Sequence, residues 1–508
     1  MSATLLILAW LTPLLTLIFV HSRFAGPVTL LAPLPALLAA VVVAAGSRVD
    51  LPWLLLGSRF GVDDHGGMFL LFSSLLWLLA AAQHALQTHA DAKAARFRVF
   101  YLLAMSGNFM LILGLDLVSF YLGFALMGLA AYGLVVHDGT GTARRAGAIY
   151  LIMTLIAEFA LLFALVLIYS RTGTLTPDPA QLVGGGTLEI GLLTLAFGIK
   201  AGVIGLHFWL PLAHPAAPVP ASAVLSGAMI KTALVGWIRY LPLGHESLPE
   251  WGVLLLVAGA AGALLAMLLG LPQQNPKVVL AYSSVGKMGT MVGALGLALI
   301  DPSAAAGIVA AVTLFAAHHG LAKGALFLGA GLVKSSASRL ALLLLLIPAL
   351  ALAALPFTTG ALAKGVLSLS LLAAETGWSV LLLWTLPIAA SGTALLMARF
   401  LYLMHLHTET KRSFALLPAL PWLALLSLIL LLPLAYGTAP APIRESWPVA
   451  LAAATAVLTL LARPAWLVAL AGRVPPGDLI EPISAQLSLF GRVIAPGGSR
   501  SGVESETI

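Results

Sequence analysis

Long apolar runs alternate with short polar segments along most of the chain. A helix needs about 20 apolar residues to cross a bilayer. Runs of that kind lie near 3–20, 28–46, 68–88, 100–114, 117–136, 146–170, 187–207, 220–240, 250–271, 278–300, 303–333, 340–370, 379–405, 414–436 and 448–470. The pattern predicts an all-α, polytopic membrane protein with about 14–15 transmembrane helices.

The composition agrees with this class and limits the chemistry. Of 508 residues, 60% are apolar and 9% are charged, whereas about 25% are charged in a typical soluble domain. The mean hydropathy is +1.04. The chain has no cysteine, which excludes thiolate-held iron–sulfur clusters, cysteine zinc sites and disulfides. We expect no cofactor in this chain, so a partner would carry most redox centres of any electron-transfer complex.

Charged loop residues alternate in sign between the two sides of the predicted membrane. Scattered basic loop residues, with a net charge of +7, are typical of membrane topology and not of nucleic-acid binding. One side carries Arg23, Lys93, Arg96, Arg98, Arg144, Arg145, Lys277, Lys334 and Arg339, and the other carries Asp50, Asp63, Asp64, Asp178, Glu246, Glu250 and Asp301. The positive-inside rule predicts a multi-pass protein of the cell inner (cytoplasmic) membrane, with its N-terminus outside.

The two ends of the chain fit the same topology. The first apolar run has no charged n-region and no clear cleavage site, so we expect a retained helix and not a signal peptide. The tail after 471 contains an amphipathic stretch at 478–493, which we expect to lie on the cytoplasmic membrane surface.

Several ionisable residues interrupt the apolar runs. An ionisable group at mid-membrane costs roughly 2.5–3.5 kcal/mol on insertion scales, so such groups face a polar interior. The set consists of Glu158, Lys200, Lys231, Lys323 and Lys364. Taken singly, Lys231 or Lys364 could extend to the headgroups from a helix end, and Glu158 could be a structural partner of a lysine. As a set in different helices, they predict a proton relay.

The chemistry of a relay suits these residue types. Burial favours the neutral amine of a lysine, whereas a neighbouring carboxylate favours the ammonium, so alternation between these conditions moves a proton. His319 and Lys323 are spaced i, i+4 and share one helix face. The adjacent His318 points elsewhere, which disfavours a metal site at this pair. We find no second histidine pair at a suitable depth for haem, and therefore predict no metal.

Glycine and proline indicate broken helices. Four prolines lie between His207 and Pro220, and a His-His-Gly sequence lies in the middle of the 303–333 run. Broken helices beside mid-membrane charges are typical of transporters, because they free backbone groups and helix ends to interact with ions or water. We expect a break in both segments.

Three stretches resemble a known family. The sequence resembles the antiporter-like subunits of respiratory complex I, Mrp-type cation/proton antiporters and membrane-bound hydrogenases. The resemblance covers about 100–400, and 226–240 is most similar to the hydrogenase-4/formate hydrogenlyase branch. The residues that carry it are Lys200 with His207–Pro211, Pro218–Ala223 and Lys231; Asn275–Ser284; and His319–Gly331.

The resemblance implies a fold and roles for individual residues. It implies two inverted five-helix repeats, each with a broken helix and a half-channel. By similarity, Lys200 and Lys364 match the lysines of the two broken helices, Lys231 matches a lysine of the next helix, Lys323 the central lysine and His319 the relay histidine. His207, His318 and Lys287 are possible accessory residues. The implied organisation is N-terminal helices (1–99), an antiporter-like core (100–400), C-terminal helices (401–471) and a cytoplasmic tail (472–508).

The chain departs from the family pattern at two positions. Ala125 stands where the family has a glutamate that pairs with the broken-helix lysine, and Lys287 stands where glutamine is usual. Glu158 is the mid-membrane candidate to replace the missing glutamate. We expect it within about 8 Å of Lys200, the reach of a short-range ion pair.

These observations favour a proton- or Na⁺-translocating subunit of a larger, oxidoreductase-type complex, with other membrane and peripheral subunits as partners. One alternative is the membrane partner of a non-redox, zinc-type enzyme in energised inorganic-carbon uptake. Another is a scaffold that no longer transports ions. The missing glutamate favours the scaffold, and the four retained lysines argue against it.

Overall fold

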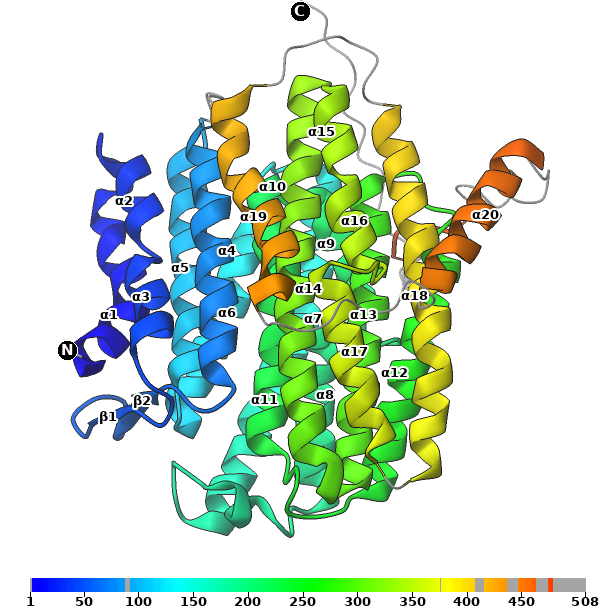
Figure 1. Cartoon of the computed structure of the whole chain (residues 1–508). Coiled ribbons are helices and arrows are strands. Elements are labelled where there is room, and N and C mark those ends of the chain that lie inside the picture. The colour runs from blue at the N-terminus through cyan, green and yellow to red at the C-terminus, as the bar shows by residue number, and fades with distance from the viewer. Residues whose placement is uncertain are drawn as a thin grey trace, which may run out of the picture.

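The computed structural model describes residues 2–86, 92–374, 376–406, 415–435, 446–462 and 474–477. These ranges are almost entirely helical (Figure 1). The first half contains α1 (Ser2–Leu15), η1 (Thr16–Phe19), α2 (Ala25–Leu31), α3 (Leu34–Val42), β1 (Arg48–Leu51), β2 (Ser58–Gly61), α4 (Gly66–Leu86), α5 (Ala94–Leu113), α6 (Leu117–Val135), α7 (Gly141–Thr172), η2 (Pro179–Leu182), α8 (Thr187–Ala201), α9 (Trp209–Ala216), α10 (Val219–Gly227), η3 (Met229–Lys231) and α11 (Thr232–Tyr240). The second half contains α12 (Pro249–Gly270), α13 (Pro276–Ile300), η4 (Pro302–Ala304), α14 (Ala305–Ser336), α15 (Arg339–Leu344), α16 (Leu346–Leu352), α17 (Thr359–Leu372), α18 (Gly377–His405), α19 (Leu416–Ala435) and α20 (Trp447–Ala462).

The helices run side by side and form a multi-pass membrane protein. Within the described ranges, 12 segments are long and apolar enough to cross a membrane. The remaining apolar runs fall on α8 and the break after it, on α15, α16 and α17, and on α20. Apolar side chains also cover the outside of the bundle: Ile152, Phe159 and Phe163 of α7 are each more than half exposed. Such a surface suits contact with lipid.

Small residues bring the central helices close together. Helix α12 packs along α13, and a Cβ atom at Gly259 would lie 2.5 Å from the carbonyl oxygen of Gly289. Likewise, a Cβ atom at Gly252 would lie 2.6 Å from the carbonyl oxygen of Gly296. Close contact between backbones stabilises such helix pairs by van der Waals packing. In lipid the hydrophobic effect does not drive helices together, because the lipid tails are as apolar as the side chains.

The first broken span has the interruption predicted between the two apolar runs. Helix α8 ends at Ala201, and Gly202 caps it in the left-handed conformation (φ 68°). The chain resumes as α9 at Trp209, and Pro218 separates α9 from α10. The positive φ explains the glycine, because a side chain there would be strained.

The second break lies in the span that carries Lys364, as the resemblance implied, and not in the 303–333 run. The expected break at His-His-Gly in the 303–333 run is wrong: α14 is continuous from Ala305 to Ser336. The interruption lies between α16 and α17, where Ala354 (φ 63°) and Phe357 (φ 65°) adopt positive φ values. Gly320 serves packing instead, because a Cβ atom there would lie 2.7 Å from the carbonyl oxygen of Gly227 in α10. Figure 1 shows α8 below α9 but α16 above α17, so the two broken spans run in opposite directions.

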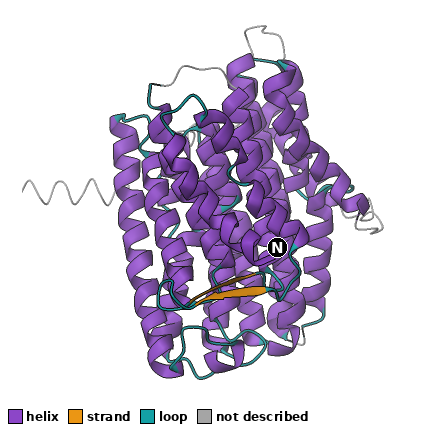
Figure 2. Ribbon diagram, turned by 90° about the vertical axis from the view of Figure 1, so that its left-hand side faces the viewer, coloured by secondary structure: helices purple, strands orange, loops and turns teal. Residues whose placement is uncertain are grey.

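Hydrogen bonds at each end of the bundle join loops that the charge pattern assigned to the same side. At the basic end, Lys93 donates to the carbonyl of Asp138 at 2.8 Å. At the acidic end, the amide of Gly184 donates to Glu246 at 2.9 Å. The antiparallel hairpin β1–β2 also lies at the acidic end (Figure 2). We call these ends the basic-loop face and the acidic-loop face.

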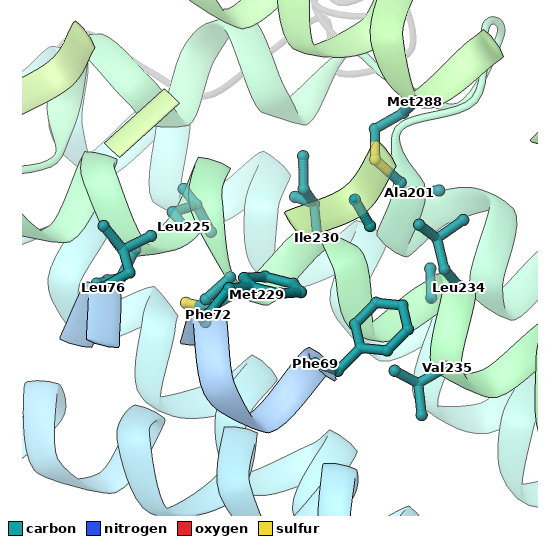
Figure 3. Packing of buried hydrophobic residues seen from close by; sticks show 14 of the residues in the cluster. Phe69, Phe72, Leu76, Ala201, Leu225, Met229, Ile230, Leu234, Val235 and Met288 are labelled. Carbon is teal, nitrogen blue, oxygen red and sulfur yellow. The ribbon is translucent and has the colours of Figure 1, made fainter. Parts of the chain in front are cut away.

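A dense apolar cluster surrounds the junction of α10, η3 and α11. Met229 and Ile230 meet Phe69, Phe72 and Leu76 of α4 in this cluster (Figure 3). Ala201, Leu234 and Met288 belong to the same cluster (Figure 3). Polar groups in this region are therefore isolated from water by close apolar packing, which strengthens their electrostatic interactions.

Candidate functional site

Glu158 of α7 and Lys200 of α8 lie side by side against Gly128 of α6. A Cβ atom at Gly128 would lie 2.8 Å from Oε1 of Glu158 and 3.4 Å from Nζ of Lys200. The two charged atoms are therefore no further apart than the sum of these distances, which is below the expected limit of about 8 Å. We call Glu158 and Lys200 the α7–α8 pair.

The α7–α8 pair has a polar surrounding despite its burial. Lys200 lies in the last turn of α8, where the negative end of the helix dipole stabilises an ammonium. Its Nζ also lies 4.9 Å from the centre of the Phe124 ring, a distance that suits a cation–π contact. Lys200 lines a small cavity together with Tyr150 and Thr154. The cavity has room for roughly one water molecule.

Ala125 lies one turn before Gly128 on α6 and is half-buried. The carboxylate beside Lys200 thus comes from α7, and α6 contributes a glycine that leaves room for it. The structure places Glu158 where the sequence hypothesis requires it. The part that Glu158 plays in transport stays a prediction.

Lys231 and Lys323 belong to one network of hydrogen bonds, which passes through the backbone of Ser226 and the carbonyl of Leu280. The ammonium of Lys231 donates to the backbone carbonyl of Ser226, and the hydroxyls of Ser226 and Ser284 share a hydrogen bond of 2.8 Å. The Ser284 hydroxyl donates to the carbonyl of Leu280 at 3.1 Å, and Lys323 donates to the same carbonyl at 2.6 Å. We call this series, Lys231–Ser226–Ser284–Leu280–Lys323, the central chain.

The second broken span holds a third group of ionisable residues. Lys287 of α13, His318 of α14 and Lys364 of α17 line one cavity. Nδ1 of His318 lies 2.9 Å from the hydroxyl of Thr359, the first residue of α17. These side chains therefore join α13 and α14 to the start of α17. We call the cavity that Lys287, His318 and Lys364 line, together with these three residues, the second cavity.

The two remaining predicted histidines have different surroundings. His319 is fully buried, and neither of its ring nitrogens has a hydrogen-bond partner among the described residues. Because α14 is continuous, His319 and Lys323 do share one helix face. His207 lies in the break after α8, where its Nδ1 accepts a hydrogen bond of 3.3 Å from the amide of Gly205.

The predicted residues thus form an interrupted series. Lys323 lies within electrostatic range of Lys231 and Lys287, and Lys287 within range of Lys364. Beside the α7–α8 pair, Ala201 packs with Ile230 and other apolar residues (Figure 3). Hydrophobic packing therefore lies next to both Lys200 and Lys231 in the chain.

Sequence reasoning missed three residues of this region. Ser226 and Ser284 complete the central chain; both lie in stretches that carry the resemblance, but serines are common in apolar helices and neither residue was predicted as a site residue. His214 of α9 is fully buried, and both ring nitrogens lack a hydrogen-bond partner in the described part of the chain. The sequence does hold a signal for His214, because it is a titratable residue inside the proline-rich segment that follows Lys200. No group of three or more histidine, aspartate or glutamate side chains in the described residues is arranged to hold a metal ion.

Two oppositely directed broken spans, with buried lysines and histidines on them and between them, give the architecture of a membrane transporter. A family model described as "NADH:quinone oxidoreductase/Mrp antiporter, TM" matches residues 114–393, more than half of the chain. The chain therefore belongs to this family of antiporter-like membrane subunits.

Individual relatives agree with this assignment. The chain is 31% identical to Hydrogenase-4 component B of Escherichia coli K12 over 281 residues, which is 53% of this chain and 42% of that protein. It is 31% identical to NADH-ubiquinone oxidoreductase chain 4 of Gadus morhua over 314 residues, 58% of this chain and 66% of the relative. The matches thus span less than two thirds of these relatives.

Solved structures share the fold. The Mrp complex from Dietzia sp. DQ12-45-1b matches 97% of this chain and 59% of the compared chain, with a TM-score of 0.77 and 20% identity. A membrane-bound sulfane sulfur reductase, described as an archaeal respiratory membrane complex, matches 92% of this chain and 99% of its own, with a TM-score of 0.71 and 18% identity. At these identities the likeness concerns the fold alone.

Proposed function

We propose that this chain is a proton- or cation-translocating membrane subunit of a larger energy-coupling complex. Its relay consists of the α7–α8 pair, the central chain with His319, and the second cavity. The chain supplies no redox centre of its own, and a partner of the oxidoreductase type supplies the driving reaction. The basic-loop face lies in the cytoplasm, and the membrane is the cell inner membrane.

The observation that carries this proposal is the central chain. Hydrogen bonds between Lys231, Ser226, Ser284, Leu280 and Lys323 bridge four helical elements, η3, α10, α13 and α14, in the apolar interior. Burying several ionisable groups is costly, and a membrane protein keeps such groups where ions or protons move. A purely structural role would need only one well-packed polar pair.

The mechanism is electrostatic. Charging one lysine changes the proton affinity of the next, because interactions between charges are strong in a medium of low dielectric constant. The two broken spans give the two ends of the relay access to opposite faces. Alternation between two conformations that differ in these interactions makes the transfer directional.

The direct test uses the native complex, purified through this chain and placed in liposomes. A potassium diffusion potential drives ion flux, which a pH-sensitive dye inside the vesicles reports, with and without Na⁺. Lys200→Ala and Lys323→Ala should each abolish the flux. Lys334→Ala is a matched control, since Lys334 lies on the same helix as Lys323 but is exposed at the basic-loop face. Wild-type flux in both test variants would reject the relay.

The partners in the same preparation identify the driving reaction. Mass spectrometry that finds iron–sulfur or nickel proteins supports a redox-driven complex. A single large zinc-type partner without redox centres supports inorganic-carbon uptake instead. Unaltered activity of the complex in the Lys200 and Lys323 variants supports a scaffold.

A further inference from the structure

His214 lies at the end of the first broken span, beside the central chain. It belongs to the last turn of α9 and is fully buried. Its ring stacks on Phe327 of α14 with the ring centres 4.7 Å apart. Phe327 follows Lys323 by one helical turn, so both side chains lie on the same face of α14. The imidazole of His214 therefore lies next to the helix face that carries Lys323.

The surroundings of His214 are unusual for a structural histidine. A buried histidine that only fills space is generally fixed by hydrogen bonds, since an unsatisfied polar atom costs about 1–3 kcal/mol. Neither ring nitrogen of His214 has such a bond within the described ranges. The charged groups in electrostatic range are Lys323, Lys277 and Lys231, from α14, α13 and η3. The ring thus lies among lysines, with no fixed acceptor to hold either nitrogen.

Lys277 provides a connection from this region to the basic-loop face. It is half-buried in the first turn of α13, and its ammonium donates to the carbonyl of Ala217 at 2.6 Å. Ala217 caps α9 just after His214. Lys277 is also in electrostatic range of Asp138 and Lys334 at the same face. Lys277 therefore connects the surface of the protein to the end of α9.

We propose that His214 is an additional proton-transfer residue, which connects Lys323 of the central chain to the basic-loop face by way of Lys277. Imidazole suits this position, because one ring nitrogen accepts a proton while the other donates one. The proton accepted from one side leaves from the other nitrogen, so the charge of the ring is restored after each transfer. This inference rests on the proposed relay and gives it an entrance on one face.

The test compares two isosteric replacements in the same liposomes. His214→Gln keeps the size and polarity of the site but cannot titrate, whereas His214→Glu keeps a titratable group. His405→Gln is the control, since His405 is exposed at the end of α18. We expect His214→Gln to lower proton flux by at least about tenfold, in line with the loss of a proton-transfer group. His214→Glu should retain flux, with a pH profile different from that of the wild type.

The outcomes separate this inference from the proposed function. Wild-type flux and pH profile in His214→Gln would overturn it, and so would equal losses in the Gln and Glu variants with the complex intact by size exclusion. If His214→Gln fails to assemble, Lys277→Gln at the protein surface replaces it: slower flux supports the path and unchanged flux overturns it. If Lys323→Ala loses flux but His214→Gln does not, the proposed relay stands and only the role of His214 is rejected.

Discussion

Replacing Gly128 by alanine is the sharpest test of the α7–α8 pair, because it adds one methyl group where the two charges meet. The new Cβ atom would lie 2.8 Å from Oε1 of Glu158, 2.9 Å from Cγ2 of Thr154 and 3.4 Å from Nζ of Lys200. The first two distances are shorter than normal contacts, so the carboxylate must move. The methyl group of Thr154 on α7 can move away only by a change of χ1, which is restricted for a β-branched residue in a helix.

The magnitude follows from this overpacking. An extra methylene in a packed interior costs typically 1–3 kcal/mol. If that cost falls on the geometry in which Glu158 faces Lys200, the flux decreases by a factor of roughly 5 to 140, at about tenfold per 1.4 kcal/mol. The fold itself should persist, because the cost is small beside the packing of so many helices.

The assay is the liposome flux measurement, with two comparisons. Leu129→Ala changes the neighbouring residue of α6, which is 44% exposed on the outer surface, and should leave the flux unchanged. Glu158→Asp shortens the acid by one methylene and relieves the contact. The double variant Gly128→Ala/Glu158→Asp should therefore transport better than Gly128→Ala alone, a coupling expected only for residues in contact.

Two results would refute this reasoning. Wild-type flux in Gly128→Ala would mean that the position of the Glu158 carboxylate does not matter for transport. An equal loss in Leu129→Ala would mean that α6 is sensitive as a whole, with no special part for the space beside Gly128.

Three further predictions follow from the contacts. Ser284→Ala removes the 2.8 Å link to Ser226 and should lower flux about tenfold without changing assembly, as flux and size exclusion will show. Burial alone would raise the pKa of Asp63, but its ion pair with Arg239 (2.7 Å) holds the pKa below its usual range. The pair is partly exposed, so Asp63→Asn should cost about 1 kcal/mol of stability at pH 7, and this difference should vanish as pH falls below that pKa, by thermal unfolding in detergent. Gly360→Ala would overlap a backbone carbonyl of α16 and should reduce the yield of assembled complex.

Much of the fold could be predicted because the bilayer imposes simple rules. Apolar runs gave the spans, and the sign of loop charges sorted the loops into two faces, as the bonds from Lys93 to Asp138 and from Gly184 to Glu246 confirm. The proline-rich segment after His207 correctly predicted an interrupted span, since Pro218 separates α9 from α10, whereas the end of α8 depends on Gly202.

The remaining features depend on tertiary contacts that a single sequence does not contain. Gly320 was expected to break α14, but its role is to let α10 approach, which only the position of Gly227 reveals. The break between α16 and α17 contains Pro356 and uses the positive φ values of Ala354 and Phe357, but it lies inside the single apolar run 340–370, so the hydrophobic pattern did not separate α16 from α17. The serines of the central chain became meaningful only when α10 and α13 were seen together. The amphipathic stretch predicted at 478–493 lies outside the described residues.

The balance of charges explains why such a relay would move protons one at a time. Four buried lysines and the half-buried Lys364 face the interior, whereas Glu158 is the one buried carboxylate of the described residues that lies away from a helix end. At an effective dielectric constant near 20, two ammoniums about 7 Å apart repel each other by roughly 2.4 kcal/mol. Such repulsion disfavours charging all the lysines of the series together, so in the proposed relay a proton that arrives at one lysine would favour release from its neighbour. The α7–α8 pair differs from the series, because the carboxylate of Glu158 can balance the positive charge of Lys200. Hydrophobic packing lies next to Lys200 and Lys231. In the proposed relay, a conformational change would have to connect the α7–α8 pair to the series, and a partner could control transport at that step.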